Sequence, residues 1–295
     1  MISGNIYYNE PVFRPPAEAY SAIIQVSLGC SWNKCAFCDM YTSKNFKIRN
    51  FIEIENDIKI LGQIQHGAKK IFLADGNAFV LAPNKLIPIL LEINKNFEKI
   101  QRISSYALPK DILSKTDNEL KDLKNLGLKL LYIGIETGDD NLLELINKGE
   151  TSKTTIEGIK KAQKAGIDTS IMIINGLGGK IYSKEHAINS AKIINEINPQ
   201  FLSTLTLSFP YGFNHFQKRF KGNFERQSMR DLFVELKLFI GNIEVNNVIF
   251  RSNHISNNLE LKGILNKDKE QILNELENAI LNTPTGLMPY ESSVL

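Results

Sequence analysis

The sequence is poor in cysteine, histidine and tryptophan, with three, four and one of these residues among 295. Three cysteines are an odd number and too few for the disulfide framework that holds small secreted folds together. No apolar run reaches the ~18 to 20 residues that a membrane-spanning helix needs. The first twenty residues contain three prolines and no basic start, which is not the pattern of a signal peptide. We therefore expect a cytoplasmic protein without a membrane span.

An excess of charge of either sign is also missing. The chain has 35 Lys+Arg and 32 Asp+Glu, a net charge of +3. This balance gives no sign of a surface that binds nucleic acid or an anionic membrane. A hydrophobic fraction of 43% with 23% charged residues excludes a disordered chain and indicates a globular one with a large core.

The few cysteines lie in one place. Cys30, Cys35 and Cys38 form a C-x4-C-x2-C arrangement in GCSWNKCAFC. Random placement would put three cysteines in so short a window with a chance on the order of 10⁻³, so the spacing calls for an explanation. Thiolates are soft ligands that suit zinc or iron-sulfur clusters. The spacing therefore predicts a metal site.

Short apolar runs alternate with amphipathic stretches of helical length along most of the chain. The runs are expected strands at 22–28, 70–75, 101–106, 129–136, 169–175 and 201–207. Their spacing is that of βα units, and near-continuous apolar strands indicate a parallel sheet covered by helices. The predicted fold class is α/β, a partial (β/α)6 TIM-like barrel, with an open doubly wound sheet as the alternative. The cysteines directly follow the first strand, where loops of such folds form the ligand site.

The βα rhythm changes after residue 207. An aromatic, turn-rich junction at 208–216 precedes two expected helices, 227–240 and 266–280, and a seventh strand at 246–252. We expect an N-terminal extension at 1–21, a partial barrel at 22–207, and a C-terminal α/β extension at 208–295.

Zinc is the main competing interpretation of the cysteine cluster. Structural zinc normally takes four protein ligands in two pairs, and this sequence has no second pair. A single distant histidine could complete the site, so a zinc-binding structural or non-catalytic protein stays open. A metal-free barrel hydrolase or lyase is the third alternative, but the strand ends carry few of the carboxylates and lysines that it would need.

The cysteine loop resembles that of the radical S-adenosylmethionine (SAM) superfamily. Its members bind a 4Fe-4S cluster through three cysteines in the loop after the first strand of a partial barrel. Their commonest spacing is C-x3-C-x2-C, and this chain has one residue more between Cys30 and Cys35. Phe37 matches the aromatic residue that precedes the last cysteine. The layout is similar to the subgroup of methylthiotransferases, Elongator-type enzymes and coproporphyrinogen dehydrogenases, and to short members without an assigned substrate.

The resemblance implies further contacts with SAM at the ends of later strands. After the second strand, a three-residue motif takes the place of the Gly-rich motif that receives the amino group, with Asn77 where an acidic residue is usual. Glu136, after the fourth strand, matches a residue that contacts the ribose or methionine portion. The glycine-bearing stretch after the fifth strand resembles the one beside the adenine. The implied residues are Asp75, Gly76, Asn77, Glu136, Asn175 and Gly176.

The activity implied by the resemblance is that of an oxygen-sensitive enzyme. A flavodoxin- or ferredoxin-like donor would reduce the cluster, SAM would be cleaved to a 5′-deoxyadenosyl radical, and the radical would abstract hydrogen from a substrate. With no fourth cysteine, an all-cysteine auxiliary cluster is excluded. An extension of ~90 residues is too short for a complete cobalamin- or RNA-binding module beside the barrel. We expect a small-molecule substrate or one that a partner presents.

Candidate substrate contacts are few. Arg251 and His254 follow the expected seventh strand and combine a fixed cation with a titratable imidazole. Tyr41 follows the last cysteine by three residues and would face the barrel mouth. The alternatives are an ordinary surface loop for the first two and a cover over the cysteine loop for Tyr41.

Overall fold

A computed structural model describes residues 6–289, which fall into two compact units. The first unit contains the residues up to 33, 40–133 and 157–169. The second contains 34–39, 134–156 and the residues from 170 onward. The cysteine loop is therefore divided, with Cys30 in the first unit and Cys35 and Cys38 in the second.

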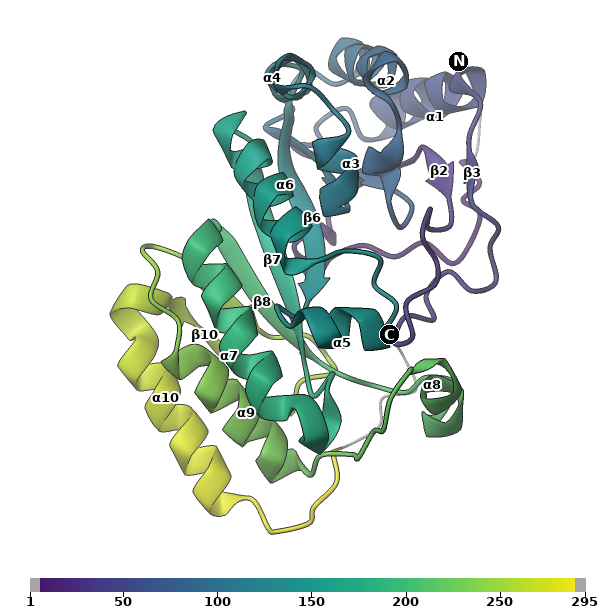
Figure 1. The fold of residues 1–295 in the computed structure, drawn as a ribbon. Coiled ribbons are helices and arrows are strands. Elements are labelled where there is room, and N and C mark those ends of the chain that lie inside the picture. The colour runs from purple at the N-terminus through teal and green to yellow at the C-terminus, as the bar shows by residue number, and fades with distance from the viewer. Residues whose placement is uncertain (1–5, 290–295) are drawn as a thin grey trace. The chain divides into compact units, whose positions relative to one another are not determined.

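Four parallel strands form the sheet of the first unit. Their order is β1 (Ala22–Gln25), β4 (Lys70–Ala74), β5 (Arg102–Tyr106) and the first part of β6 (Leu128–Glu136). The apolar runs form strands because both faces are covered, and Ile71, Phe72 and Leu73 are fully buried. The helices of this part are α1 (Phe51–Ile64), α2 (Pro83–Asn96), α3 (Pro109–Leu113), α4 (Asp117–Asn125) and the end of α6 (Ser152–Lys164). Helices α1 and α2 lie side by side (Figure 1).

Helix starts in the first unit follow local signals. Pro83 and Pro109 occupy the first turns of α2 and α3, where a missing N–H breaks no hydrogen bond. Thr116 and Glu119 form a capping box at α4, and each satisfies a backbone N–H that the helix leaves open. The remaining short elements are η1 (Pro16–Glu18) and η2 (Ala78–Val80).

Two very short strands hold the cysteine loop at its base. β2 (Ser27–Leu28) pairs antiparallel with β3 (Lys47–Ile48). The chain leaves β2 into the loop and returns through β3. The loop is thereby closed at both ends.

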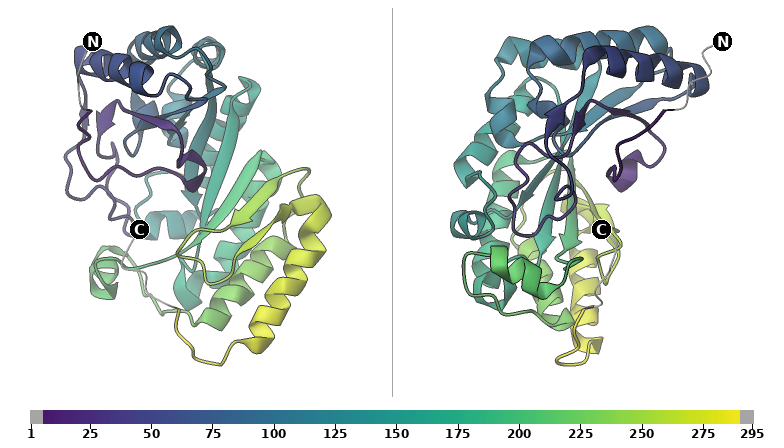
Figure 2. Two further views of the ribbon diagram at one scale, coloured as in Figure 1. Left: turned by 180° about the vertical axis from the view of Figure 1, so that it is seen from behind. Right: turned by 90° about the vertical axis from the view of Figure 1, so that its right-hand side faces the viewer.

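The second unit continues the α/β pattern. β7 (Asp168–Asn175), β8 (Phe201–Thr206) and β9 (Ile249–Ser252) are parallel, and β10 (Leu261–Ile264) is antiparallel to β9. Its helices are α5 (Asp140–Leu145), α7 (Gly179–Ile197), α8 (Phe213–Arg219), α9 (Met229–Gly241) and α10 (Leu265–Asn282). Helix α9 packs against both α7 and α10 (Figure 2).

The predicted succession of βα units is confirmed. All six expected strands and the seventh at 246–252 have counterparts. Helix α8 was not expected, because it lies in the segment interpreted as a turn-rich junction. It has only seven residues and no side-chain cap, so packing of its phenylalanines stabilises it more than local signals do.

The expected strand at 22–28 is divided into β1 and β2. Strands β3 and β10 were not expected, because strands of two to four residues are too short for a periodic pattern. The division at residues 21 and 207 stays a prediction, and residues 1–5 and 290–295 of the two expected extensions lie outside the described part. No helix within residues 6–289 is long and apolar enough to cross a membrane.

Candidate functional site

The cysteine side chains are partly exposed, and none of the three is in a disulfide. Gly29, at φ +72°, opens the loop in a conformation that favours glycine. In the described part of the chain, no three His, Cys, Asp or Glu side chains form a group arranged to hold a metal ion. The role of Cys30, Cys35 and Cys38 as cluster ligands therefore stays a prediction.

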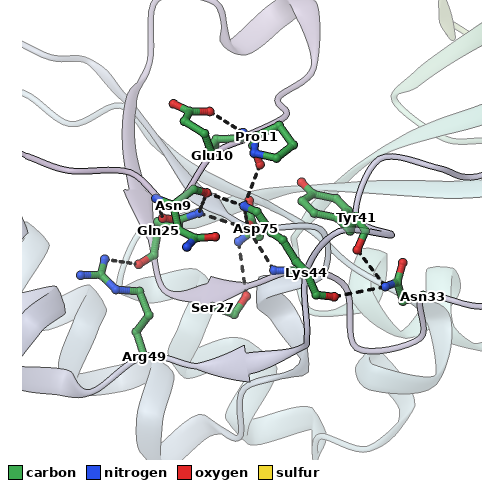
Figure 3. A network of polar contacts seen from close by, with 12 residues as sticks. Asn9, Glu10, Pro11, Gln25, Ser27, Asn33, Tyr41, Lys44, Arg49 and Asp75 are labelled. Carbon is green, nitrogen blue, oxygen red and sulfur yellow. Dashed lines mark hydrogen bonds and ion pairs between the residues drawn. The ribbon is translucent and has the colours of Figure 1, made fainter. Parts of the chain in front are cut away.

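Asp75 fastens the start of the cysteine loop in the first unit (Figure 3). Its Oδ2 accepts from the Gly29 backbone N–H at 3.0 Å, from Gln25 Nε2 at 3.1 Å and from Lys44 Nζ at 2.8 Å. Lys44 also donates to the carbonyl oxygens of Asn9 and Pro11. Burial raises the pKa of Asp75, although the Lys44 ammonium and the Gly29 amide oppose that effect. Asp75 Oδ2 thus accepts three hydrogen bonds that stabilise the start of the loop.

Gly76 lies directly against Cys30. Its N–H donates to the Gly29 carbonyl at 3.2 Å. A Cβ on Gly76 would come within 3.1 Å of Cys30 Cβ and 2.7 Å of Tyr41 Cδ2. No side chain larger than hydrogen fits there without a shift. The glycine therefore brings the end of β4 into contact with the first cysteine.

Asn77 joins the cysteine loop to α3. Its Nδ2 donates to Ser31 Oγ at 2.7 Å and to Asp111 Oδ2 at 2.6 Å. The Asp111 carboxylate can only accept, which fixes the orientation of the amide. Asn77 Oδ1 and Asp75 Oδ1 are buried and have no hydrogen-bond partner among residues 6–289. Such unpaired buried acceptors are uncommon, and they match a site that receives an ammonium group.

Tyr41 is buried and covers the three-residue motif of Asp75, Gly76 and Asn77, the glycine motif. Its ring packs edge-to-face on Phe13 at 5.4 Å between centroids. The ring occupies the space beside Gly76 that a side chain would need. This placement supports the alternative of a cover over the loop. A substrate contact by Tyr41 stays a prediction without support from its position.

The segment with Cys35 and Cys38 is held in the second unit by the end of α5. Ala36 N–H donates to the Ile146 carbonyl at 2.8 Å, and Asn147 Nδ2 donates to the Lys34 carbonyl at 3.2 Å. Phe37 packs against an apolar cluster that includes Ala36 and Ile146. The two later cysteines therefore sit on an ordered support.

Glu136 ends β6 in an unusual backbone conformation. Its φ is +66°, which a non-glycine residue seldom adopts. The side chain folds back over Gly134, where a Cβ would come within 2.9 Å of Glu136 Cδ. Glu136 is 7% exposed. Strain of this kind is found where a side chain is held for a function.

Lys148 is the partner of Glu136. Its Nζ lies 2.8 Å from Glu136 Oε1 and 5.7 Å from the centre of the Phe37 ring. Burial disfavours the charge, but the Glu136 carboxylate and the negative charge that Cys35 and Cys38 carry as thiolates outweigh burial and raise the pKa of Lys148. A charged lysine is thus held between the end of β6 and the cysteine segment.

Asn175 and Gly176 connect β7 to α9. Asn175 Nδ2 donates to the Leu232 carbonyl at 3.1 Å, and the Gly176 N–H donates to Glu235 Oε1 at 2.6 Å. A Cβ on Gly176 would lie 2.6 Å from Leu232 Cδ2. Their donors are therefore used in packing α9, and the predicted role beside the adenine stays untested.

His254 and Arg251, the two other candidate substrate contacts, lie in different surroundings. His254 lies in the loop after β9, and its Nδ1 accepts from the Ser256 N–H at 3.2 Å, so the proton of the neutral ring is on Nε2. Burial lowers its pKa. Arg251 is exposed within β9 and lines a polar pocket of about 400 Å³ beside Lys262 and Asp268. Its position gives no support to a substrate contact.

Sequence reasoning missed Lys44, Asp111 and Lys148. Lysine and aspartate are usually exposed, and none of these three belongs to the motifs that carry the resemblance. Asp111 follows a proline in a short helix, and Lys148 follows an Asn at positive φ after α5. These local signals indicate turns and do not indicate burial.

The residues present fit a SAM-binding cluster in their chemistry. Three thiols are within one loop, two unpaired buried acceptors lie beside it, and a charged lysine is close to the second and third cysteines. Soft thiolates suit iron-sulfur clusters. Buried acceptors suit the ammonium group of an amino acid.

Comparisons with known proteins agree with this chemistry. A family model described as the radical SAM superfamily matches residues 24–191. An uncharacterised methyltransferase of Pyrococcus horikoshii is 26% identical over 205 residues, which cover 66% of this chain and 42% of that protein. A tRNA-2-methylthio-N(6)-dimethylallyladenosine synthase of Sulfurihydrogenibium is 25% identical over 188 residues, 60% of this chain and 41% of that protein. The chain thus spans about two fifths of the length of these relatives.

The fold also has solved counterparts. Coproporphyrinogen III oxidase (HemN) from Escherichia coli, described as a radical SAM enzyme, superposes with a TM-score of 0.57 at 17% identity. The match covers 75% of this chain and 52% of that one. The predicted fold class, an α/β partial barrel, is confirmed by this likeness and by the mostly parallel strands.

Proposed function

Because the chain belongs to the radical SAM superfamily, we propose that it is an enzyme that holds a 4Fe-4S cluster through Cys30, Cys35 and Cys38 and binds SAM beside it. When bound, the cluster and SAM would supply the one-electron chemistry that yields a 5′-deoxyadenosyl radical and abstracts hydrogen from a substrate. The chain's own residues bind the cluster and SAM, orient them, and exclude water from them.

The contact between the glycine motif and the first cysteine carries the proposal. Gly76 lies against Cys30 with no room for a side chain, and Asp75 fastens the adjoining backbone of Gly29. Unpaired buried oxygens of Asp75 and Asn77 lie on the same short motif. A metal ligand and an ammonium-binding motif placed together are what a SAM-chelating site requires.

Asn77 and Glu136 have distinct roles in the proposal. Asn77 Oδ1 accepts from the SAM amino group, in the position where relatives place an acidic residue. Glu136 accepts from the ribose or methionine portion, and Lys148 orients its carboxylate by pairing with Oε1 at 2.8 Å. Phe37 shields the segment between the last two cysteines from water.

His254 is the candidate for contact with a small-molecule substrate. Its Nδ1 is occupied by Ser256, so Nε2–H is the donor that a substrate carbonyl or hydroxyl would meet. Arg251 is left out of this role because it lines a separate polar pocket. A flavodoxin- or ferredoxin-like protein is the proposed electron donor.

The test is anaerobic reconstitution with iron and sulfide. The unaltered protein should hold roughly four iron and four sulfide ions per chain, and SAM should change the electron paramagnetic resonance signal of the reduced protein. Cys30→Ala, Cys35→Ala and Cys38→Ala should each lose the metal, whereas Ser43→Ala, an exposed change in the same loop, should retain it. Zinc without sulfide in the purified protein would instead establish the structural zinc alternative.

A further inference from the structure

A residue beyond the part matched by the family model contacts the cysteine segment. Arg219 is the last residue of α8, and the matched part ends at residue 191. Its Nη2 donates to the Cys35 carbonyl at 2.7 Å, and its Nη1 donates to the Cys38 carbonyl at 3.4 Å. Nη1 also lies 2.6 Å from Asp39 Oδ1. One guanidinium thus contacts three groups of the segment 35–39, which contains two predicted ligands.

Helix α8 is fixed where this contact needs it. Phe216 and Phe220 are buried in the same apolar cluster as Ala36, which lies between the two cysteines. His215, one turn before Arg219, places Nε2 3.1 Å from Asp39 Oδ1. Asp39 is 7% exposed and Arg219 is half-buried, so little water competes with the hydrogen bond between them.

We propose that Arg219 is a positioning residue for the cluster ligands Cys35 and Cys38, a role that rests on the proposed function. Cys38 N–H donates to the Cys35 carbonyl at 3.3 Å, so the two residues form one turn. A planar guanidinium that binds both carbonyls fixes the peptide planes of that turn. The direction in which the two thiols leave the backbone is fixed with them.

The guanidinium also brings positive charge to a segment that would carry thiolates. Groups that orient metal ligands typically change metal affinity 10- to 100-fold when removed. Loss of Arg219 should therefore speed cluster loss by about tenfold or more. Lysine presents a single ammonium that cannot meet Asp39 and both carbonyls together, so Arg219→Lys should be intermediate.

The experiment compares cluster retention in reconstituted proteins after a chelator is added. The rate of loss of the cluster absorption is measured for the unaltered protein, Arg219→Ala, Arg219→Lys and Lys218→Gln. Lys218 is the neighbouring exposed cation on α8, so its removal changes the charge alone. Free guanidinium at millimolar concentration is added to Arg219→Ala as a rescue.

Faster loss in Arg219→Ala, slowed by guanidinium, with Lys218→Gln equal to the unaltered protein, supports the proposal. Equal rates in Arg219→Ala and the unaltered protein overturn it. A change in the melting temperature of metal-free Arg219→Ala with no rescue by guanidinium also overturns it, because the residue is then only structural. An unaltered protein that takes up no iron-sulfur cluster contradicts the proposed function itself, and the role of Arg219 falls with it.

Discussion

At the scale of single residues, the candidate site is built from buried charges with defined partners. Lys44 and Asp75 pair where the cysteine loop begins, and Lys148 and Glu136 pair near its later half. Breaking one member of a buried pair leaves an uncompensated charge, which is strongly destabilising. Single substitutions at these pairs would therefore mix effects on folding with effects on the site, and double substitutions are needed to separate them.

The contact between Asn77 and Asp111 can also be tested by a double substitution. Its amide donates to Asp111 at 2.6 Å, so Asn77→Asp, although closer to the family pattern, would set two carboxylates against each other. We expect a loss of about 1 to 3 kcal/mol in the free energy of unfolding, measured by urea denaturation. Asn77→Asp combined with Asp111→Asn restores a donor and should recover most of the loss. Additive losses in the double variant would show that the two side chains do not interact as described.

Burial of Lys115 should make the free energy of unfolding depend on pH. Its Nζ donates to the Phe79 carbonyl at 2.8 Å, and burial lowers its pKa from 10.5 to about 8, although Asp111 and Glu119 oppose that effect. The unfolded chain then holds a proton that the folded chain releases between about pH 8 and 10.5. The stability cost of burial is full below pH 8 and fades as pH rises through this window.

Relative to Lys115→Met, the unaltered protein should gain up to about 3 kcal/mol between pH 8 and 10.5. Urea unfolding across this range measures the difference, with exposed Lys121→Met as the control. Parallel curves for the unaltered protein and Lys115→Met would contradict a lowered pKa.

At the scale of elements, the ends of strands shape the site. Gly76, two residues after the end of β4, lies against Cys30, and β6 ends in a residue at positive φ whose carboxylate folds over Gly134. Both arrangements depend on missing side chains at positions where a methyl group would collide. At the carboxyl ends of both strands, a glycine thus leaves room for another side chain close to the backbone.

Gly134→Ala tests this arrangement. The added methyl group meets the Glu136 carboxyl group, so the pair with Lys148 should be displaced and the unfolding free energy should fall by about 1 to 3 kcal/mol. SAM affinity of the reconstituted protein, measured by calorimetry, should fall as well. Gly67→Ala, which meets nothing within 4 Å, is the matched control. Unchanged affinity in Gly134→Ala would remove Glu136 from the proposed SAM contacts.

The sequence predicts these elements better than it predicts their partners. Apolar runs and the cysteine spacing located the strands and the loop, because periodicity and rare residues leave a local signal. Lys148 and Arg219 left none, since a buried lysine or a half-buried arginine looks like a surface residue in the sequence until the fold supplies Glu136 or the Cys35 carbonyl. The short helix α8 was missed because its stability comes from the aromatic cluster.

At the scale of the whole molecule, the two compact units each contribute to the cysteine loop. Cys30 and the glycine motif belong to the first unit, and Cys35, Cys38 and Glu136 belong to the second. Arg219, which lies beyond the family match, also belongs to the second unit and contacts Cys35 there. In the second unit, a residue outside the family match therefore supports the segment with Cys35 and Cys38.

In the proposed function, the three cysteines serve SAM cleavage. The direct measurement is 5′-deoxyadenosine formed from SAM by the reconstituted protein under anaerobic conditions with a strong reductant. We predict that 5′-deoxyadenosine forms with the unaltered protein and with Ser43→Ala, and falls to background in Cys30→Ala, Cys35→Ala and Cys38→Ala. A protein fully loaded with iron and sulfide that never forms 5′-deoxyadenosine, or one that forms it equally well without the cysteines, would contradict the claim.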